Sequence, residues 1–163
     1  MPPAISCSTR SRASLTTGTD GVRPQRTGPF ISVRPLSTAL VLASPAFHAG
    51  GTIPARYTCS GADLSPPLRW TAPPPGTRSF SIAMIDVTVG FVHWRASAIP
   101  ATARSLPAGA RLQRVAVNGF GRRGYGGPCP PAGAPHHYVF TLRALGPGGR
   151  VIGAASLAGR FAR

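Results

Sequence analysis

Hydrophobic and polar residues alternate along several short stretches of the 163-residue chain, and this alternation predicts β-strands. The clearest stretch, residues 79–85 (SFSIAMI), reads as a buried strand that runs directly into Asp86. Residues 137–142 (HYVFTL) are aromatic and β-branched enough to form a second strand. Leu68 and Trp70 alternate onto one face of a third, and Trp70 is expected in the core rather than against a ligand.

Glycine and proline divide the rest of the chain into short elements. The chain contains 20 Gly and 19 Pro, which favour strands joined by turns over long helices. Residues 38–42 (TALVL) predict the first strand, and residues 91–100 (FVHWRASAIP) predict another. In the latter, alternation places His93 with Phe91 on one face and Trp94 on the other. The pattern predicts a mainly β domain with little helix.

Residues 1–38 have no sustained periodicity and are rich in Ser, Thr, Arg, Gly and Pro. They are expected to form a disordered tail or to reflect a start of translation placed too early. The organised domain is expected to span residues 39–163. No stretch approaches the ~18–20 apolar residues of a membrane helix, and no secretory signal is evident near the start. A cytoplasmic location is therefore expected.

The charge is strongly basic. All 18 basic residues are Arg, the only acids are Asp20, Asp63 and Asp86, and the net charge is +15. Nucleic acid, anionic lipid and phosphorylated ligands all suit such a chain, and so does an arginine-rich surface with no ligand at all. The arginines are scattered and form no basic amphipathic helix, so the nucleic-acid signal is weak.

Four separated motifs together resemble one family. They are IPARYTCSG followed by SPPLRW, FVHW followed by IP, GYGGPCPP followed by HHYVF, and the closing ASLAGRFAR. The same motifs in the same order are found in the phosphatidylethanolamine-binding proteins, and the bacterial and archaeal Raf-kinase-inhibitor-like branch is the most similar. The resemblance covers about residues 40–163. It implies an antiparallel Greek-key β-sandwich whose C-terminal helical segment is largely missing, because residues 146–149 (GPGG) cannot form a helix.

The resemblance also implies a binding site and a function. The family gathers the counterparts of Asp86, His93, His136 and Tyr138 around one small pocket, with the glycine-proline loop as its rim. The candidate ligand-binding residues are Asp86, His93, Gly127, Pro128, Cys129, Pro130, His136 and Tyr138. The implied function is non-enzymatic binding of a small phosphorylated ligand or phospholipid head group, without cofactor or metal. A kinase or protease partner follows from the resemblance alone.

The residue types suit that chemistry. His93 and His136 can each donate a hydrogen bond to phosphate, and an anion favours their cationic form because their reference pKa is about 6.5. Tyr138 would add a hydroxyl donor and an aromatic wall. Asp86 would accept from a histidine N–H and so fix its tautomer, or it would pair with the amine of an ethanolamine head group.

Two departures from the family pattern bear on this site. The first acid is followed by Val87-Thr88-Val89-Gly90 where the family has D-P-D-x-P, so the loop before His93 is shorter. The family's H-R-Y has become HHY, with His137 in place of an arginine. In the family that arginine is structural as much as functional, so we expect its loss to reduce stability around the pocket and to lower or abolish the affinity for anions.

Cysteine chemistry provides the alternatives. Cys129 paired with a histidine would make a nucleophile for a hydrolase, and zinc would draw on His93, His136, His137 and Cys129, although no typical ligand spacing supports it. A disulfide between Cys59 and Cys129 is conceivable, but geometry decides it and the sequence does not give that geometry. A reduced pair in a cytoplasmic protein is the expectation.

Overall fold

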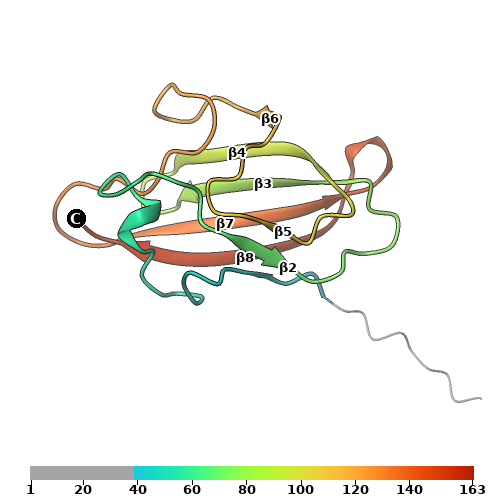
Figure 1. The fold of residues 1–163 in the computed structure, drawn as a ribbon, viewed down its shortest axis with the longest axis horizontal. Helices are drawn as coiled ribbons and strands as arrows, with labels where there is room; N and C mark the ends of the chain where they lie inside the picture. Colours follow the sequence, from blue (N-terminus) through green and yellow to red (C-terminus); the bar gives the residue numbers. More distant parts are fainter. Residues whose placement is uncertain (1–38) are drawn as a thin grey trace, which may run out of the picture. The chain divides into compact units, whose positions relative to one another are not determined.

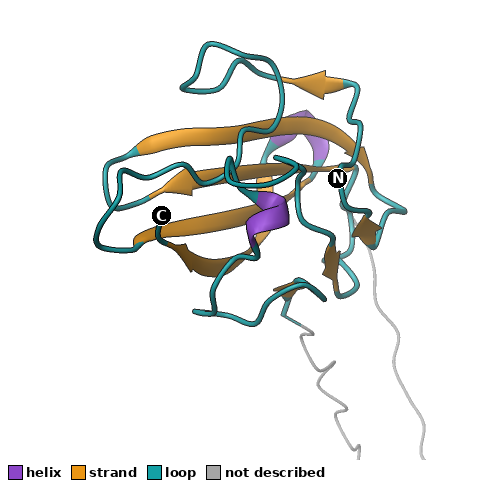
Figure 2. Ribbon diagram, turned by 60° about the vertical axis from the view of Figure 1, so that its left-hand side comes forward, coloured by secondary structure: helices purple, strands orange, loops and turns teal. Residues whose placement is uncertain are grey.

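The structure, a computed structural model, describes residues 39–163, and strands and loops make up almost all of them (Figures 1 and 2). The expected tail, residues 1–38, lies outside the described residues. Two three-residue 3-10 turns, η1 (Ala55–Tyr57) and η2 (Pro147–Gly149), provide the helix in this part of the chain. The strands are β1 (Leu42–Ala43), β2 (Leu68–Trp70), β3 (Ser79–Asp86), β4 (Phe91–Pro100), β5 (Ser105–Leu106), β6 (Arg114–Val115), β7 (His136–Leu145) and β8 (Val151–Phe161).

These strands form two antiparallel sheets. The larger sheet has the order β6-β4-β3-β7-β8, and the smaller has the order β1-β2-β5. Figure 1 looks onto the two sheets, with the smaller one in front of the larger. The core lies between them and includes Trp70 from the small sheet and Phe80 and Phe140 from the large one. The predicted mainly β sandwich, with Trp70 in its core, is confirmed.

Strand β3 is the centre of the large sheet, and its burial follows the two-residue period of its sequence. Phe80, Ile82 and Met84 face the core, while the residues between them are only partly buried. The neighbouring β7 repeats this pattern with Phe140 and Leu142. Each such side chain stabilises the fold by about 1.5–3 kcal/mol through burial. The register of the large sheet is therefore strongly fixed, because a one-residue slip would turn these side chains to the other face.

The two ends of the domain differ in how well they follow the sequence pattern. The first strand is Leu42–Ala43 rather than residues 38–42, because the amide of Val41 bonds the Thr71 hydroxyl at 2.9 Å instead of a ladder carbonyl. At the other end, β7 and β8 pair directly with each other and are joined through η2, where the family would place a helical segment. No helix within residues 39–163 has the length and apolar character that crossing a membrane requires.

Candidate ligand-binding pocket

The core-facing stripe of the large sheet ends in polar residues. On β3 the stripe Phe80-Ile82-Met84 continues to Asp86, which is 3% exposed. On β7 the residue opposite Asp86 is Tyr138, and His136 precedes it by one two-residue step. Period-two geometry therefore carries a carboxylate and an imidazole to the same end of the sandwich, on the side that faces the core.

A β-bulge in β4 brings His93 to the same place. Met84 pairs with Trp94 and Ile85 pairs with Val92, so His93 is the extra residue between them. Bulges redirect side chains in this way and are common beside functional sites. Both His93 and Trp94 are buried as a result, at 3% and 2% exposure. The expectation that they occupy opposite faces was wrong, because simple alternation does not survive an inserted residue.

Asp86 and His136 form a tightly coupled pair. The Nδ1 atom of His136 lies 2.6 Å from Oδ2 of Asp86, and the amide of Thr88 donates to Oδ1 at 2.9 Å. The hydroxyl of Thr88 in turn accepts from the amide of His137 at 2.9 Å. Both carboxylate oxygens are thus occupied by this chain's own donors. Asp86 therefore orients His136, as one reading of the sequence expected, and each carboxylate oxygen keeps a further lone pair toward the pocket that Asp86 lines.

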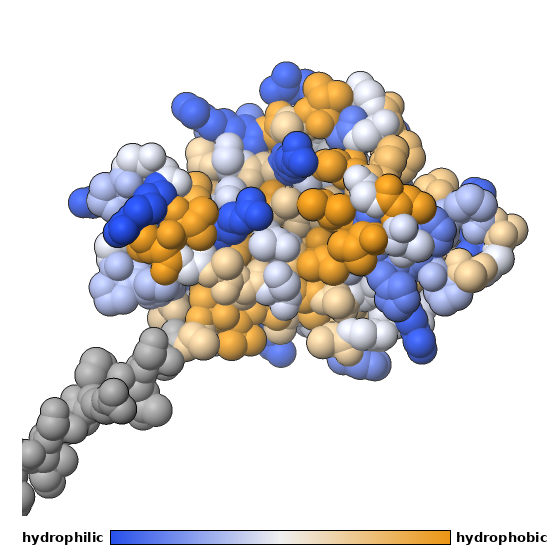
Figure 3. All heavy atoms as spheres, turned by 180° about the vertical axis from the view of Figure 1, so that it is seen from behind, coloured by the Kyte–Doolittle hydropathy of each residue, from blue (hydrophilic) through white to orange (hydrophobic). Residues whose placement is uncertain are grey.

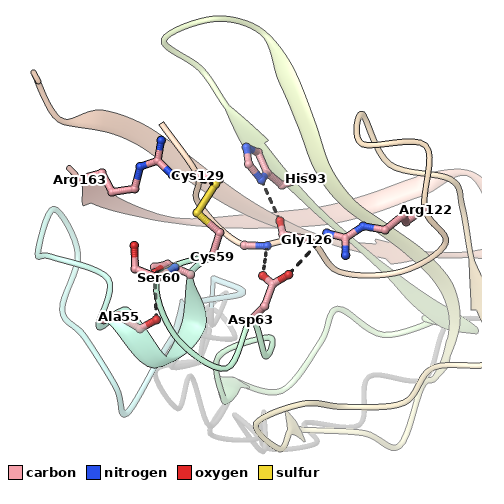
Figure 4. Close-up of a disulfide and its surroundings, with 11 residues drawn as sticks. Ala55, Cys59, Ser60, Asp63, His93, Arg122, Gly126, Cys129 and Arg163 are labelled. Atoms are coloured by element: carbon pink, nitrogen blue, oxygen red, sulfur yellow. Dashed lines mark hydrogen bonds and ion pairs between the residues drawn. A yellow bond between two sulfur atoms is a disulfide. The ribbon is translucent and has the colours of Figure 1, made fainter. Parts of the chain in front are cut away.

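His93 is held by a backbone carbonyl. Its Nδ1 atom lies 2.8 Å from the oxygen of Gly126 (Figure 4), and because a carbonyl only accepts, Nδ1 must carry the proton. Burial lowers the pKa of His93 below its ordinary value of 6.5, and the Gly126 hydrogen bond and the charge of Asp86 oppose that shift. The neutral ring therefore presents a lone pair at Nε2, and no hydrogen bond within residues 39–163 uses that atom.

The loop that supplies Gly126 is fastened to the segment around η1. The amide of Gly127 donates to Oδ1 of Asp63 at 2.6 Å, and Arg122 lies 3.5 Å from the other oxygen of that carboxylate. A β-carbon at Gly127 would meet the carbonyl oxygen of Tyr57 at 2.6 Å, so this close approach requires glycine. Figure 4 shows the two contacts of the Asp63 carboxylate, one toward Arg122 and one toward the loop at Gly126.

A disulfide completes the attachment. Cys59 and Cys129 are bonded, with their α-carbons 5.3 Å apart and a sequence separation of 70. The expectation of a reduced pair was wrong, because the folded loops bring the two α-carbons within bridging distance, which the sequence could not show. A sulfur in a disulfide provides no thiolate, so the hydrolase alternative based on Cys129 loses its nucleophile in this form.

A pocket of about 280 Å³ opens where these pieces meet. Its lining comes from the strands β3, β4 and β7, from the turn between β3 and β4, from the proline loop and from Phe120. Its lining residues are Asp86, Val89, Phe91, His93, Phe120, Cys129, Pro130, Pro131 and His136. Five of the residues predicted from sequence therefore face one cavity: Asp86, His93, Cys129, Pro130 and His136.

The other three predicted residues lie behind the residues that line the pocket. Gly127 and Pro128 are buried within the loop and do not line the pocket. Tyr138 is fully buried, with its ring packed edge-on against His93 at 5.3 Å between centroids. Its hydroxyl has no hydrogen-bond partner of acceptable geometry, and burial, followed by the nearby charge of Asp86, raises its pKa. Tyr138 does not line the pocket in this geometry and packs behind the His93 ring, and its expected role as a ligand donor stays a prediction.

Sequence reasoning missed the aromatic wall formed by Phe91 and Phe120. Phe120 stacks edge-on against Phe91 at 4.7 Å and against His93 at 5.3 Å. Asn118 shapes the loop that carries it, since its side-chain oxygen accepts from the amides of Phe120 and Arg122 at 3.0 and 3.2 Å. The short-range signal was present in FVHW, where Phe91 precedes His93 by one strand period. The contribution of Phe120 needed the three-dimensional path of the loop.

One cation also stands close to the pocket. Arg163 approaches Cys129 with Nη1 at 3.8 Å from the sulfur (Figure 4), and Cys129 itself lines the cavity. Within residues 39–163, no group of three or more His, Cys, Asp or Glu side chains is arranged to hold a metal ion. The considered zinc set does not assemble: His137 is exposed, and Cys129 is bonded to Cys59.

Comparisons with known proteins are consistent with this architecture. The sequence profile described as phosphatidylethanolamine-binding protein matches residues 43–161. A protein of Aquifex aeolicus named UPF0098 is 42% identical over 112 residues, which is 63% of this chain and 66% of that protein. LppC of Mycobacterium tuberculosis, named as a candidate lipoprotein, is 40% identical over 117 residues, which is 66% of this chain and 56% of LppC. The chain thus spans between half and two thirds of these curated relatives.

A solved structure gives the same result for the fold. The crystal structure of YbcL from Escherichia coli, described as a member of the mammalian PEBP family, superposes with a TM-score of 0.69. The match covers 76% of this chain and 98% of YbcL at 25% sequence identity. The sandwich therefore recurs in a protein of known structure.

Proposed function

This chain belongs to the phosphatidylethanolamine-binding protein family, and from that premise we propose that its pocket binds a small phosphorylated ligand or a phospholipid head group without transforming it. The observation that supports the proposal best is the convergence of His93, His136 and Asp86 on one mostly apolar cavity. A binding module is what the family name implies, and the ligand class rests on the chemistry of these three side chains.

The two imidazoles offer complementary contacts. Asp86 holds Nδ1 of His136, so Nε2 of that ring is free to donate to a phosphate oxygen whenever the ring is protonated. The neutral His93 presents an acceptor at Nε2, which suits a phosphate oxygen that still carries a proton. A phosphomonoester has its second pKa near 6, so one of its oxygens can donate a hydrogen bond to His93 while another accepts from His136. Arg163 adds an exposed positive charge near the rim.

The size of the cavity limits what can enter. About 280 Å³ lies just below the roughly 300–1,000 Å³ of typical small-molecule sites. The cavity therefore accommodates a phosphate with a short substituent and leaves acyl chains outside. The rings of Phe91 and Phe120 and the prolines suit the methylene groups of that substituent, since apolar surface gains by leaving water.

We infer that the protein is not an enzyme. A hydrolase needs an activated nucleophile beside a base, and the sulfur of Cys129 is bonded to Cys59. The carboxylate of Asp86 already accepts from His136 and Thr88. The test is hydrolysis of p-nitrophenyl phosphate and p-nitrophenyl acetate by the native protein, and turnover that disappears in Asp86→Asn or His136→Gln would refute the inference.

Isothermal titration with O-phosphoethanolamine and inorganic phosphate tests the binding proposal. We expect His136→Gln to weaken binding by about 10- to 150-fold, the equivalent of a charged hydrogen bond of about 1.5–3 kcal/mol. His137→Gln is the matched control, because His137 is the next residue in the chain but is exposed and outside the pocket. Equal losses in the two variants, or no saturable binding by the native protein, would contradict the proposal.

A second arm separates the two sources of the phosphate. Short-chain phosphatidylethanolamine below its micellar concentration should compete with O-phosphoethanolamine if the head group is the ligand. Competition by phosphoethanolamine alone would indicate a free metabolite, because the acyl chains would then obstruct entry. Thermal unfolding of each variant shows whether it remains folded, so a loss of binding can be assigned to the missing imidazole.

The disulfide bears on the cellular compartment in which the protein is located. Structural disulfides persist in oxidising environments and are rare in the cytosol of mesophiles, and one relative is named as a candidate lipoprotein. We therefore infer a location outside the cytosol, in contrast to the cytoplasmic expectation. Trapping free thiols with a mass-tagging reagent in intact cells tests this, and two reactive thiols at Cys59 and Cys129 would contradict it.

A further inference from the structure

The outer face of the large sheet carries a groove that is separate from the pocket. Along β3 the outward residues Ser81 and Ala83 are small. Arg95 on β4 lies opposite Ala83, and Arg143 on β7 lies opposite Ser81. Because neighbouring strands are about 4.8 Å apart, two long cationic side chains flank a trough roughly 10 Å wide. Figure 3 shows this reverse face, where strongly hydrophilic side chains stand between hydrophobic ones.

The edge of the sheet provides a second wall. Strand β6 pairs with β4 and places Arg114 opposite Ser97. Arg123 reaches the same groove, and its Nη2 donates to the carbonyl of Val115 at 2.9 Å, which holds the guanidinium in place. The groove has a volume of about 440 Å³ and is lined by four arginines, Arg95, Arg114, Arg123 and Arg143. The hydroxyls of Ser81, Ser97 and Thr141 line the same groove.

Within residues 39–163, no carboxylate pairs with these four positive charges. The acids within residues 39–163 are Asp63 and Asp86, and their ion pairs are with Arg122 and His136. Four like charges around one groove raise its potential and attract anions. We propose that this groove binds a compact small molecule that carries several phosphate groups, at a site distinct from the pocket.

The lining favours this class of ligand over other anions. Guanidinium groups pair with phosphate oxygens in a bidentate manner, and hydroxyls on the floor add further donors. The volume lies within the range of small-molecule sites. No aromatic side chain lines the groove, so bases of a single-stranded nucleic acid would find no ring to stack on. The site is therefore expected to select ligands by the number and spacing of their phosphate groups rather than by the rest of the molecule.

Inorganic tripolyphosphate is the probe for a direct test. Isothermal titration of the full chain compares the native protein with Arg95→Gln/Arg143→Gln, which removes both flanking cations. The control is Arg56→Gln/Arg69→Gln, which changes the net charge by the same amount at exposed positions outside the groove. We expect the groove variant to bind at least about a hundredfold more weakly, about tenfold for each charge-assisted contact, and the control to change by less than about threefold.

Several results of this titration would overturn the proposed site in the groove. Equal weakening of both double variants would mean that net charge alone attracts the anion, and that would overturn the site. So would the absence of tripolyphosphate binding by the native protein, or binding that His136→Gln abolishes, since His136 lies in the pocket. Displacement of tripolyphosphate by a short DNA duplex at stoichiometric concentration, with a steep salt dependence, would replace the proposed ligand with nucleic acid. Circular dichroism spectra identical to the native one establish that the glutamine variants are folded.

Discussion

Removing the Cys59–Cys129 disulfide should destabilise the domain strongly. The bond closes a loop with a sequence separation of 70 residues. It joins the segment after η1 to the proline loop that walls the pocket. The same junction also holds three hydrogen bonds: Gly127 N–H to Asp63 at 2.6 Å, Tyr125 hydroxyl to the carbonyl of Tyr57 at 2.8 Å, and Cys59 N–H to the carbonyl of Pro128 at 3.1 Å. These bonds exist only in the folded state, whereas the disulfide also restricts the unfolded chain.

The expected loss follows from that restriction. Chain-entropy theory assigns about 4.4 kcal/mol at 25 °C to a closed loop of this length. Measured values usually fall below the theory, so we expect a loss of about 3–4 kcal/mol in the free energy of unfolding. For a domain of this size, each kcal/mol corresponds to about 3–5 °C in Tm, so the midpoint should fall by about 10–20 °C.

Urea denaturation followed by fluorescence measures this loss. The test variant is Cys59→Ala/Cys129→Ala, and Cys7→Ala is the control, because it removes a cysteine and leaves the disulfide intact. The native protein with reductant should unfold like the double variant, whereas Cys7→Ala without reductant should unfold like the native protein. A loss below about 1 kcal/mol in the double variant, with an unchanged m-value, would refute the reasoning, because it would mean that the three hydrogen bonds alone hold the junction.

Three further outcomes are expected. Gly127→Ala should cost about 1–3 kcal/mol in urea denaturation, because its β-carbon would lie 2.6 Å from both the Tyr57 carbonyl oxygen and Asp63 Oδ1; an unchanged midpoint would contradict the close approach. Burial lowers the pKa of His93 below 6.5, so the unfolded state binds more protons than the folded state between pH 6.5 and the pKa of the folded protein. The free energy of unfolding should therefore not depend on His93 above pH 6.5 and should fall as the pH drops below 6.5. His93→Asn should flatten this part of the plot of urea midpoint against pH. Sulfate affinity at the pocket should rise between about pH 7.5 and 5.5 as His93 gains a proton. A phosphomonoester carries its own proton near pH 6, so it should already bind well at a higher pH than sulfate does. Identical pH profiles for the two anions would rule out an acceptor role for His93.

The parts of the fold that follow a simple period could be predicted from the sequence. The alternation in SFSIAMI placed Phe80, Ile82 and Met84 in the core, and the same period carried Asp86 to the end of the stripe. The position of His136 at the start of β7 followed from the change from a proline-rich loop to a β-branched run. These features are local, because each depends on residues within one strand.

Features that depend on contacts between distant segments could not be predicted in this way. The bulge that turns both His93 and Trp94 inward depends on a mismatch with β3, which neither strand shows alone. The bond between Cys59 and Cys129 depends on two loops 70 residues apart in sequence. The pocket wall at Phe120 depends on hydrogen bonds that Asn118 makes within its own loop.

The two departures from the family pattern have less effect on the pocket than the sequence suggested. The shortened segment between Asp86 and Phe91 forms a tight hairpin turn that remains attached to β7, because the Thr88 hydroxyl accepts from the His137 amide and the Val87 amide donates to the His137 carbonyl at 2.9 Å. Its Val89 still lines the cavity.

The lost arginine position is occupied by His137, which is exposed and alternates with His136 and Tyr138 along β7. A side chain at that position therefore points away from the face that carries the pocket. An arginine there would not donate to a ligand in the pocket, so its absence removes no direct contact. The nearby cation comes from Arg163 instead, beside Cys129 at the rim. We expect His137→Arg to leave phosphoethanolamine affinity nearly unchanged, whereas Arg163→Gln should weaken it by about two- to fivefold, the usual range for an exposed charge pair. A gain of tenfold or more in His137→Arg, measured by the same titration, would show that the arginine of the family reaches the ligand after all.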